Sequence, residues 1–227
     1  MPMKKPNINK NRIISYLVGL FIMTIGVSIS VKSNLGVSPV SSIPYTITLN
    51  WGIEMGNATI LFHAVLVLLQ IIILRRDFKP KNLLQIFAGI IFGKFTTFSN
   101  MLMGYLPDTD NIIIRLAMLL VSIVIIAFGI FLYVPADIVP LAGEGIMQAI
   151  SVKAGIEFSK VKIAFDISMV VISAAICLIR LKSLGSVGIG TVIAAVLVGM
   201  VLGFIMKRFK GRLDIFLGYA EKEDSSK

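Results

Sequence analysis

Long runs of apolar residues dominate the pattern of this chain. Six runs approach the ~20 residues that an α-helix needs to cross a hydrocarbon core about 30 Å thick. They are Ile13 to Val31, Ala58 to Leu74, Leu83 to Leu106, Leu116 to Val134, Ile163 to Ile179 and Val187 to Met206. The pattern predicts an all-α polytopic membrane protein with six transmembrane helices. An even number of spans places both termini on one side of the membrane.

Two further segments are apolar but too broken to span. Asn34 to Gly52 follows the first run and contains Pro39 and Pro44, and Pro135 to Ser151 follows the fourth run. Irregular backbone at membrane depth is tolerated where protein or a wet cavity satisfies its amide groups, so two re-entrant segments in matching positions predict a shared central cavity. The alternative is two interfacial helices that lie flat on opposite leaflets. Polar side chains favour the cavity: Ser38, Ser41, Ser42, Tyr45, Thr46, Glu144 and Gln148.

The first two spans and the segment between them recur later in the chain at one offset. Gly26, Ile47, Gly52, Ile53, Glu54, Ile60 and Phe62 return as Gly129, Ile150, Gly155, Ile156, Glu157, Ile163 and Phe165, since 129−26 and 165−62 both equal 103. The third span of each half aligns through Gly89-x-x-x-Gly93 and Gly199-x-x-x-Gly203. Three spans in each half predict a 3+3 inverted repeat, which in many secondary transporters carries the binding site at the repeat interface.

These boundaries predict a single membrane domain over residues 1–227. The first repeat covers about 13–106 and the second about 112–207, while 1–12 and 208–227 are expected to be polar tails. Hydrophobic residues make up 56% of the chain and mean hydropathy is +0.91, far above a soluble domain. The first apolar run is long enough to span and is followed by no small-x-small cleavage site, so we expect it to remain as a helix.

Basic residues gather on one side of the six-span arrangement. The clusters are Lys4, Lys5, Lys10 and Arg12; Arg75, Arg76, Lys79 and Lys81; and Lys207, Arg208, Lys210 and Arg212, joined by Lys153, Lys160 and Lys162. Only Lys32, Arg115, Arg180 and Lys182 fall on the other side. The positive-inside rule then predicts that both termini are cytoplasmic. The net charge of +10 therefore reflects membrane orientation, and no nucleic-acid partner is expected.

The motifs of common enzymes are missing from the sequence. A single histidine, His63, excludes a HExxH zinc site, and no Gly-x-Ser-x-Gly elbow or Walker A loop occurs. Cys177 is the only cysteine and is expected to pack inside the fifth span. We therefore expect no enzymatic activity, no metal and no cofactor, with the lipid bilayer as surroundings and an oligomer left open.

Three motifs resemble a known group, the YczE/YyaS/YitT-type family of small bacterial integral membrane proteins. They are Asn34-Leu35-Gly36-Val37-Ser38-Pro39, then Gly143-Glu144-Gly145 with Gln148-Ala149-Ile150-Ser151, and Gly188-Ile189-Gly190-Thr191. The resemblance runs from about Ile13 to Met206 and implies the fold and a location in the bacterial cytoplasmic (plasma) membrane, with small-molecule transport commonly supposed. Many relatives follow the first motif with a Trp-Asp pair where this chain has Val40 and Ser41, so no acidic role is carried over there.

Ionisable residues within the apolar runs are candidates for function, because a charge at membrane depth is costly. His63 and Asp166 are repeat mates, since 166−63 equals 103. They are interpreted either as proton or ion carriers or as groups that hydrogen-bond a nearby broken segment. Lys94 lies mid-span after Gly93, and we expect it to pair with a carboxylate of the second half, foremost Glu144, or with an anionic solute.

Several polar residues complete the expected solute site at the centre. The residues expected to contact a solute are Asn34, Ser38, Ser41, Ser42, Tyr45, Lys94, Asp137, Glu144 and Gln148. Glu144 could equally serve as the partner of a helix dipole, and Glu54 and Glu157 are interpreted as helix-initiating groups. The glycine pairs of the third and sixth spans, Gly89 with Gly93 and Gly199 with Gly203, are expected to pack these two spans against each other.

Three functions compete on this evidence. The favoured one is a small secondary transporter for a polar or anionic metabolite that works by alternating access between the two halves. The second is a binding-only subunit of a larger transporter. The third is a membrane assembly or regulatory factor that has no substrate.

Overall fold

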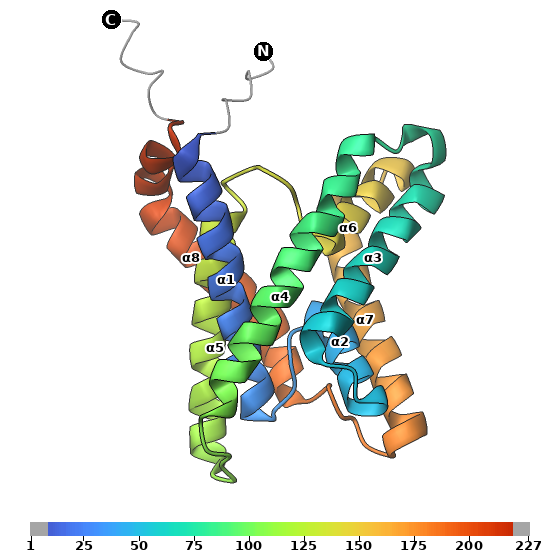
Figure 1. The fold of residues 1–227 in the computed structure, drawn as a ribbon, viewed down its shortest axis with the longest axis vertical. Coiled ribbons are helices and arrows are strands. Elements are labelled where there is room, and N and C mark those ends of the chain that lie inside the picture. The colour runs from blue at the N-terminus through green and yellow to red at the C-terminus, as the bar shows by residue number, and fades with distance from the viewer. Residues whose placement is uncertain (1–8, 220–227) are drawn as a thin grey trace, which may run out of the picture.

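Every regular element that the structure, a computed structural model, describes over residues 9–219 is helical (Figure 1). The long helices are α1 (Lys10–Ser33), α3 (Met55–Leu74), α4 (Leu84–Gly104), α5 (Ile112–Tyr133), α7 (Phe158–Leu181) and α8 (Ile189–Leu217). The short ones are α2 (Pro39–Trp51), α6 (Ala142–Ala154) and the 3-10 turns η1 (Arg75–Asp77) and η2 (Pro80–Leu83). Six helices are long and apolar enough to cross a membrane, which confirms the predicted all-α polytopic class.

The helices begin and end where capping residues permit. Asn9 precedes α1 and its side chain accepts a hydrogen bond from the Arg12 amide at 2.9 Å. Glu54 caps α3 by accepting from the Gly56 and Asn57 amides at 2.8 and 3.0 Å. Glu54 is therefore itself the N-cap, which confirms its helix-initiating role. Glu157 occupies the same position before α7, where its carboxylate accepts from the Ser159 hydroxyl at 2.6 Å.

The backbone repeats at the offset that the sequence predicted. Helix α6 has the bounds of α2 shifted by 103, since 142−39 and 154−51 both equal 103, and the start of α7 matches that of α3 because 158−55 equals 103. Asn34 and Asp137, also 103 apart, are both left-handed, with φ of 53° and 47°. Both are non-glycine residues in a rarely occupied conformation, so the loops before the two short helices share this conformation at equivalent positions.

Helices α1 and α5 form the most extensive helix–helix contact of the bundle. Glycine makes this possible: a Cβ at Gly129 would lie 2.7 Å from the Met23 backbone nitrogen, and one at Gly26 would lie 2.9 Å from that of Ile126. Gly26 and Gly129 are repeat mates, so equivalent positions of the two halves meet here.

The two short helices pack inside the bundle. Helix α2 contacts α7 and α6 contacts α3. One core cluster joins Ala142 and Ile146 of α6 to Phe62, Leu66 and Phe165 of the neighbouring helices. Figure 1 shows α6 in the half of the molecule that carries the termini and α2 in the other half. Neither helix lies flat on the outside, so the interfacial alternative does not describe this structure.

The two ends of the described chain meet at one end of the bundle, which we call the terminal face; the other end is the opposite face. The Asn9 side chain donates to the Leu217 carbonyl at 3.0 Å and the Asn11 side chain to that of Phe216 at 2.9 Å. Helix α8 continues to Leu217, so much of the expected C-terminal tail is helical. Lys4, Lys5 and the segment from Glu221 lie outside the described residues.

The predicted packing of the third and sixth spans against each other through their glycines is wrong. Gly89 and Gly93 of α4 lie against α3, where a Cβ would fall 2.7 Å from the His63 Cβ and 2.6 Å from the Gly56 carbonyl. Gly199 and Gly203 of α8 have nothing within 4 Å of a Cβ. The two glycine pairs therefore sit in different surroundings, one packed and one open.

Candidate functional site

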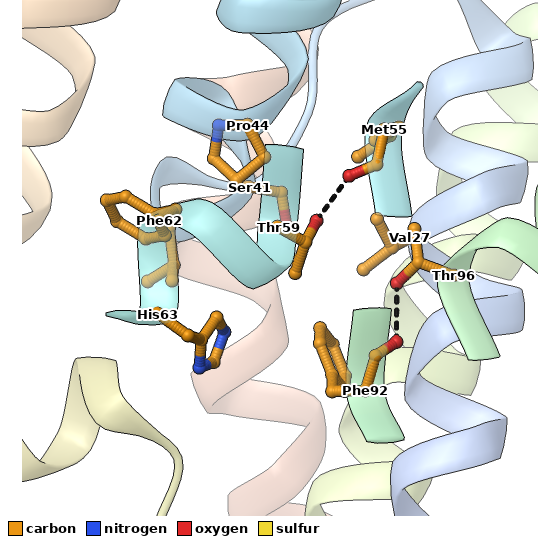
Figure 2. Close-up of a pocket in the computed structure, with 10 residues that line it drawn as sticks. Val27, Ser41, Pro44, Met55, Thr59, Phe62, His63, Phe92 and Thr96 are labelled. Atoms are coloured by element: carbon orange, nitrogen blue, oxygen red, sulfur yellow. Dashed lines mark hydrogen bonds between the residues drawn. The ribbon is translucent and has the colours of Figure 1, made fainter. Parts of the chain in front are cut away.

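A small internal pocket lies where α1, α2, α3 and α4 converge (Figure 2). It has room for about one water molecule. Its lining residues are Val27, Val40, Ser41, Pro44, Met55, Thr59, Phe62, His63, Phe92 and Thr96. The hydroxyls of Thr59 and Thr96 donate to carbonyls of their own helices at 2.7 and 2.8 Å. Their donors are therefore already used, which leaves the His63 imidazole and the Ser41 hydroxyl as the other polar groups of the wall.

His63 lies on α3 with only 4% of its surface exposed. Its ring stands between Phe62 and Phe92, with centroid distances of 6.2 and 5.9 Å. Gly89 of α4 lets the imidazole approach the neighbouring backbone. The buried Nδ1 has no hydrogen-bond partner among the described residues. A buried nitrogen without a partner is unfavourable, so this atom is a candidate to bind a water molecule or a polar solute.

Asp166, the repeat mate of His63, has a similar unsatisfied atom. One carboxylate oxygen accepts from Lys162, one turn earlier on α7, while the buried Oδ1 has no partner in the described chain. Neither His63 nor Asp166 bonds to a short helix, so the hydrogen-bonding alternative for this pair is not what the structure shows. Their role in proton or ion coupling stays a prediction.

A second polar cluster surrounds the start of α6. The Leu141 amide donates to the Tyr133 hydroxyl at 2.6 Å, and that hydroxyl donates to the Glu144 carboxylate. Tyr16 of α1 lies beside Tyr133 with a centroid distance of 5.5 Å and donates to the Val139 carbonyl at 3.0 Å. Burial raises the pKa of the Glu144 carboxyl, although the Tyr133 hydrogen bond opposes this shift.

Phe92 connects the two sites. Its side chain lines the pocket beside His63 and also belongs to the core cluster that contains Tyr16, Tyr133 and Leu141. The ring therefore packs both beside the imidazole and in the apolar cluster around the two tyrosines.

A pair of buried amides, missed in the sequence, also contacts the start of α6. Gln70 of α3 donates to the Gln85 side chain of α4 at 2.9 Å and to the Ala142 carbonyl at 3.3 Å. The Gln70 Oε1 is buried and without a partner in the described residues, close to Gly145. Glutamine within an apolar run was the available signal, since such amides inside a membrane bundle usually join helices.

Two of the three motifs that suggested the family are in direct contact at the opposite face. The Gly190 amide donates to the Leu35 carbonyl at 2.8 Å, and the Val37 amide donates to the Ser186 carbonyl at 3.2 Å. Gly36, at φ 102°, packs against the backbone of Gly188. The loop before α2 is thus fixed to the loop before α8, far away in the sequence.

Comparison with known proteins shows the family of the chain. The profile of DUF6198, a family of unknown function, matches residues 10–207. The chain belongs to this family. It is 25% identical over 190 residues to the uncharacterized membrane protein YczE of Bacillus subtilis, covering 83% of this chain and 82% of YczE. It is 24% identical over 191 residues to the uncharacterized protein YyaS of the same organism, covering 84% and 90%. No solved structure matches the chain.

The structure does not bring all nine expected solute-contacting residues together. Ser41 lines the pocket and accepts from the Ser38 hydroxyl at 3.0 Å, and Glu144 joins the tyrosine cluster. Ser42 instead packs α2 on α7 through Ser173 at 2.8 Å. The others lie elsewhere: Tyr45 in an apolar cluster beside Val27, Asn34 as the exposed C-cap of α1, and Asp137 and Gln148 on the surface.

The predicted ion pair between Lys94 and Glu144 is wrong. Lys94 is exposed on the outer side of α4, in line with Phe87, Ile90 and Phe98, and it has no ion pair among the described residues. Successive residues of a helix are rotated by about 100°. Because Gly93 faces α3, the next side chain points away from the bundle interior.

Arg12 has a structural role that the sequence did not reveal. Only 1% of the residue is exposed. Its guanidinium donates to the Ala136 carbonyl at 2.9 Å and to the Tyr219 hydroxyl at 2.8 Å, and it lies 3.8 Å from the Asp137 carboxylate. In the sequence, Arg12 was one of several basic residues before the first span. In the fold it holds the loop that leads to α6.

Proposed function

We propose that this protein is a small secondary transporter in which two inverted halves alternate access to a site between them. One observation carries the proposal: each half contains a half-length helix buried between full spans, at a single offset of 103. Transporters place substrate sites where such broken helices meet. The buried atoms without partners on His63 and Asp166 support it, because unsatisfied polar groups inside a membrane bundle usually serve a solute or ion path.

The site that we propose comprises the His63 pocket and the tyrosine cluster of Tyr16, Tyr133 and Glu144, with Phe92 packed beside both. The pocket has room for about one water in this conformation, so the solute would enter only when the Phe92 ring moves. Lys94 was the basis for an anionic solute, and its side chain points outward. We therefore propose a small polar solute without net negative charge, contacted by Ser41, His63 and Glu144.

We further propose that the terminal face is cytoplasmic. The described basic residues near that face outnumber those near the opposite face, where Lys32 and Arg115 pair with Asp108 and Asp110 at 2.6 and 2.7 Å. The Lys32 hydrogen bond holds the pKa of the Asp108 carboxyl below its usual range, so this pair stays charged at neutral pH.

A thermal-shift screen of polar metabolites against the purified protein tests the proposal, because a ligand that binds the folded state raises the melting temperature. Hits are then assayed for uptake into proteoliposomes that contain only this protein. We expect Ser41→Ala and His63→Gln each to lower the apparent affinity for the ligand, taken from the thermal shift, at least tenfold. Lys94→Met should leave this affinity unchanged. Binding without uptake would favour the binding-only subunit, and no ligand at all would favour the assembly factor.

A further inference from the structure

The two halves of the chain match in backbone but differ in how their third span packs. In the first half, α4 lies along α3: Gly89 meets His63 and Gly93 meets Ile60. The N-cap carboxylate of Glu54 accepts a hydrogen bond from the Thr97 hydroxyl of α4 at 2.9 Å. This contact joins the beginning of α3 to the middle of α4 at the opposite face.

The second half contains the same features without the contact. An offset of 103 takes the residues of α3 onto those of α7. An offset of 110, from 199−89 and 203−93, takes the residues of α4 onto those of α8. These offsets would place Gly199 over Asp166 and Gly203 over Ile163, but in the structure nothing lies within 4 Å of a Cβ at either glycine. Ile163 is 61% exposed, whereas Ile60 is partly buried against α4. The offset of 110 also fits the packing of the other face. Val198 packs against the cluster that contains Leu119 and Ile123, and its mate Ala88 belongs to the cluster that contains Tyr16 and Leu20.

Charge supports the correspondence. The mates of Glu54 and Thr97 are Glu157 and Lys207, because 157−54 equals 103 and 207−97 equals 110. Glu157 has Ser159 as its side-chain partner, and Lys207 is exposed on α8 without an ion pair among the described residues. A carboxylate and an ammonium thus occupy the two positions that would meet if α8 packed on α7. That contact would lie at the terminal face.

We propose that the face of α8 that carries Gly199 and Gly203 docks on α7 of the same chain in a second conformation. There Glu157 pairs with Lys207, Gly199 covers Asp166, and α4 separates from α3. The described structure is then one of two states, closed at the opposite face through Glu54 and Thr97. The other state is closed at the terminal face. This inference rests on the proposed alternation of two halves. Its test measures which helices are in contact and needs no substrate.

Cross-linking in native membranes tests the second state. In a Cys177→Ser background, Ile163→Cys with Gly203→Cys reports the α7–α8 contact, and Glu54→Cys with Thr97→Cys reports the α3–α4 contact. A short bis-maleimide is added and linked peptides are identified by mass spectrometry. We expect both pairs to link within one chain. If Glu54→Cys with Thr97→Cys links but Ile163→Cys with Gly203→Cys does not, the proposal is overturned. A product of twice the monomer mass from the Ile163→Cys, Gly203→Cys pair would also overturn it, because a second copy of the chain would then cover this face.

Charge reversal identifies the proposed ion pair. Lys207→Glu should lower α7–α8 linkage about fivefold, and Glu157→Lys combined with Lys207→Glu should restore it. Failure of the double reversal to restore linkage would refute the pair. Gly199→Leu should also block linkage because it fills the docking face, while Gly211→Leu, another α8 glycine with open space around it, should not. Linkage without transport in proteoliposomes would refute only the proposed function; transport without linkage would refute only this inference.

Discussion

At the scale of single residues, two of the buried polar atoms that have no partner among the described residues set the strongest constraint. Nδ1 of His63 and Oδ1 of Asp166 occupy equivalent positions of the two halves, and both lie within spanning helices. A buried polar atom left unpaired costs about 1–3 kcal/mol. A fold that keeps two of them in matching places is expected to use them for a proton, an ion or a polar solute.

The first prediction concerns coupling by this pair. Asp166→Asn should remove the dependence of uptake on a pH gradient but leave exchange of labelled for unlabelled solute intact, because exchange needs no net proton movement. His63→Gln should have a milder effect. Asp110→Asn, which changes an exposed loop carboxylate, is the control. Gradient dependence that survives in both variants would show that coupling lies elsewhere.

The second prediction concerns Glu144, whose carboxyl pKa is raised by burial in the fold. The folded state then binds more protons than the unfolded chain, so stability falls as pH rises from the usual carboxyl pKa through the raised one. Glu144→Gln removes this loss. The melting temperature of the variant should exceed that of the parent at pH 7, and the difference should shrink toward pH 4.

A companion variant checks the cause of that difference. Tyr133→Phe removes the hydroxyl that donates to the carboxylate, so the pKa of Glu144 should rise further and the pH dependence of stability should become steeper. Melting curves in detergent between pH 4 and pH 8 measure both variants. A flat difference between parent and Glu144→Gln across this range would contradict the assignment.

At the scale of elements, the contact between the loops before α2 and α8 is the feature most sensitive to a single methyl group. A Cβ at Gly36 would lie 2.5 Å from the Gly188 nitrogen, and φ there is 102°. Gly36→Ala should therefore destabilise the protein by about 2–3 kcal/mol. Gly143→Ala is the matched control, because its Cβ would lie 3.6 Å from Val40 in a regular helix turn. Chemical denaturation of both variants gives the comparison; equal losses would contradict the tight contact.

The elements themselves were readable from the sequence because their signals are local. Apolar runs gave the six spans, prolines and glycines gave the two short helices, and the offset of 103 gave their correspondence. The partners of each helix face were not readable. The glycine pair in α4 indicated a close neighbour but not that this neighbour is α3. Lys94 was misplaced for the same reason, since its position along the span was clear and its direction around the helix was not.

The residues of the candidate site also fall into those that the sequence predicted and those that it did not. His63 and Ser41 were expected and line the pocket, because polar residues in apolar surroundings stand out in a sequence. Tyr133 and Arg12 were missed, because a tyrosine at a helix end and an arginine before a span are ordinary in membrane proteins. Only the path of the loop from α5 to α6 gives them their partners at Leu141 and Ala136.

At the scale of the whole molecule, the arrangement of the two halves across the bilayer decides whether transport by alternation is feasible. Equivalent, exposed positions of the two halves provide the test: Ile53 precedes α3, Ile156 precedes α7, and 156−53 equals 103. Both side chains stand outside the apolar spans, so cysteines there should react readily.

The last prediction is therefore that Ile53→Cys and Ile156→Cys, each in a Cys177→Ser background, react from opposite sides of the membrane. In intact cells a membrane-impermeant maleimide should label Ile53→Cys alone, and Ile156→Cys should become reactive only in inside-out vesicles, because the positive-inside rule places the terminal face in the cytoplasm. Labelling of both from one side would show that the halves are parallel. The proposed alternation, and with it the docking of α8 on α7, would then lose its geometric basis.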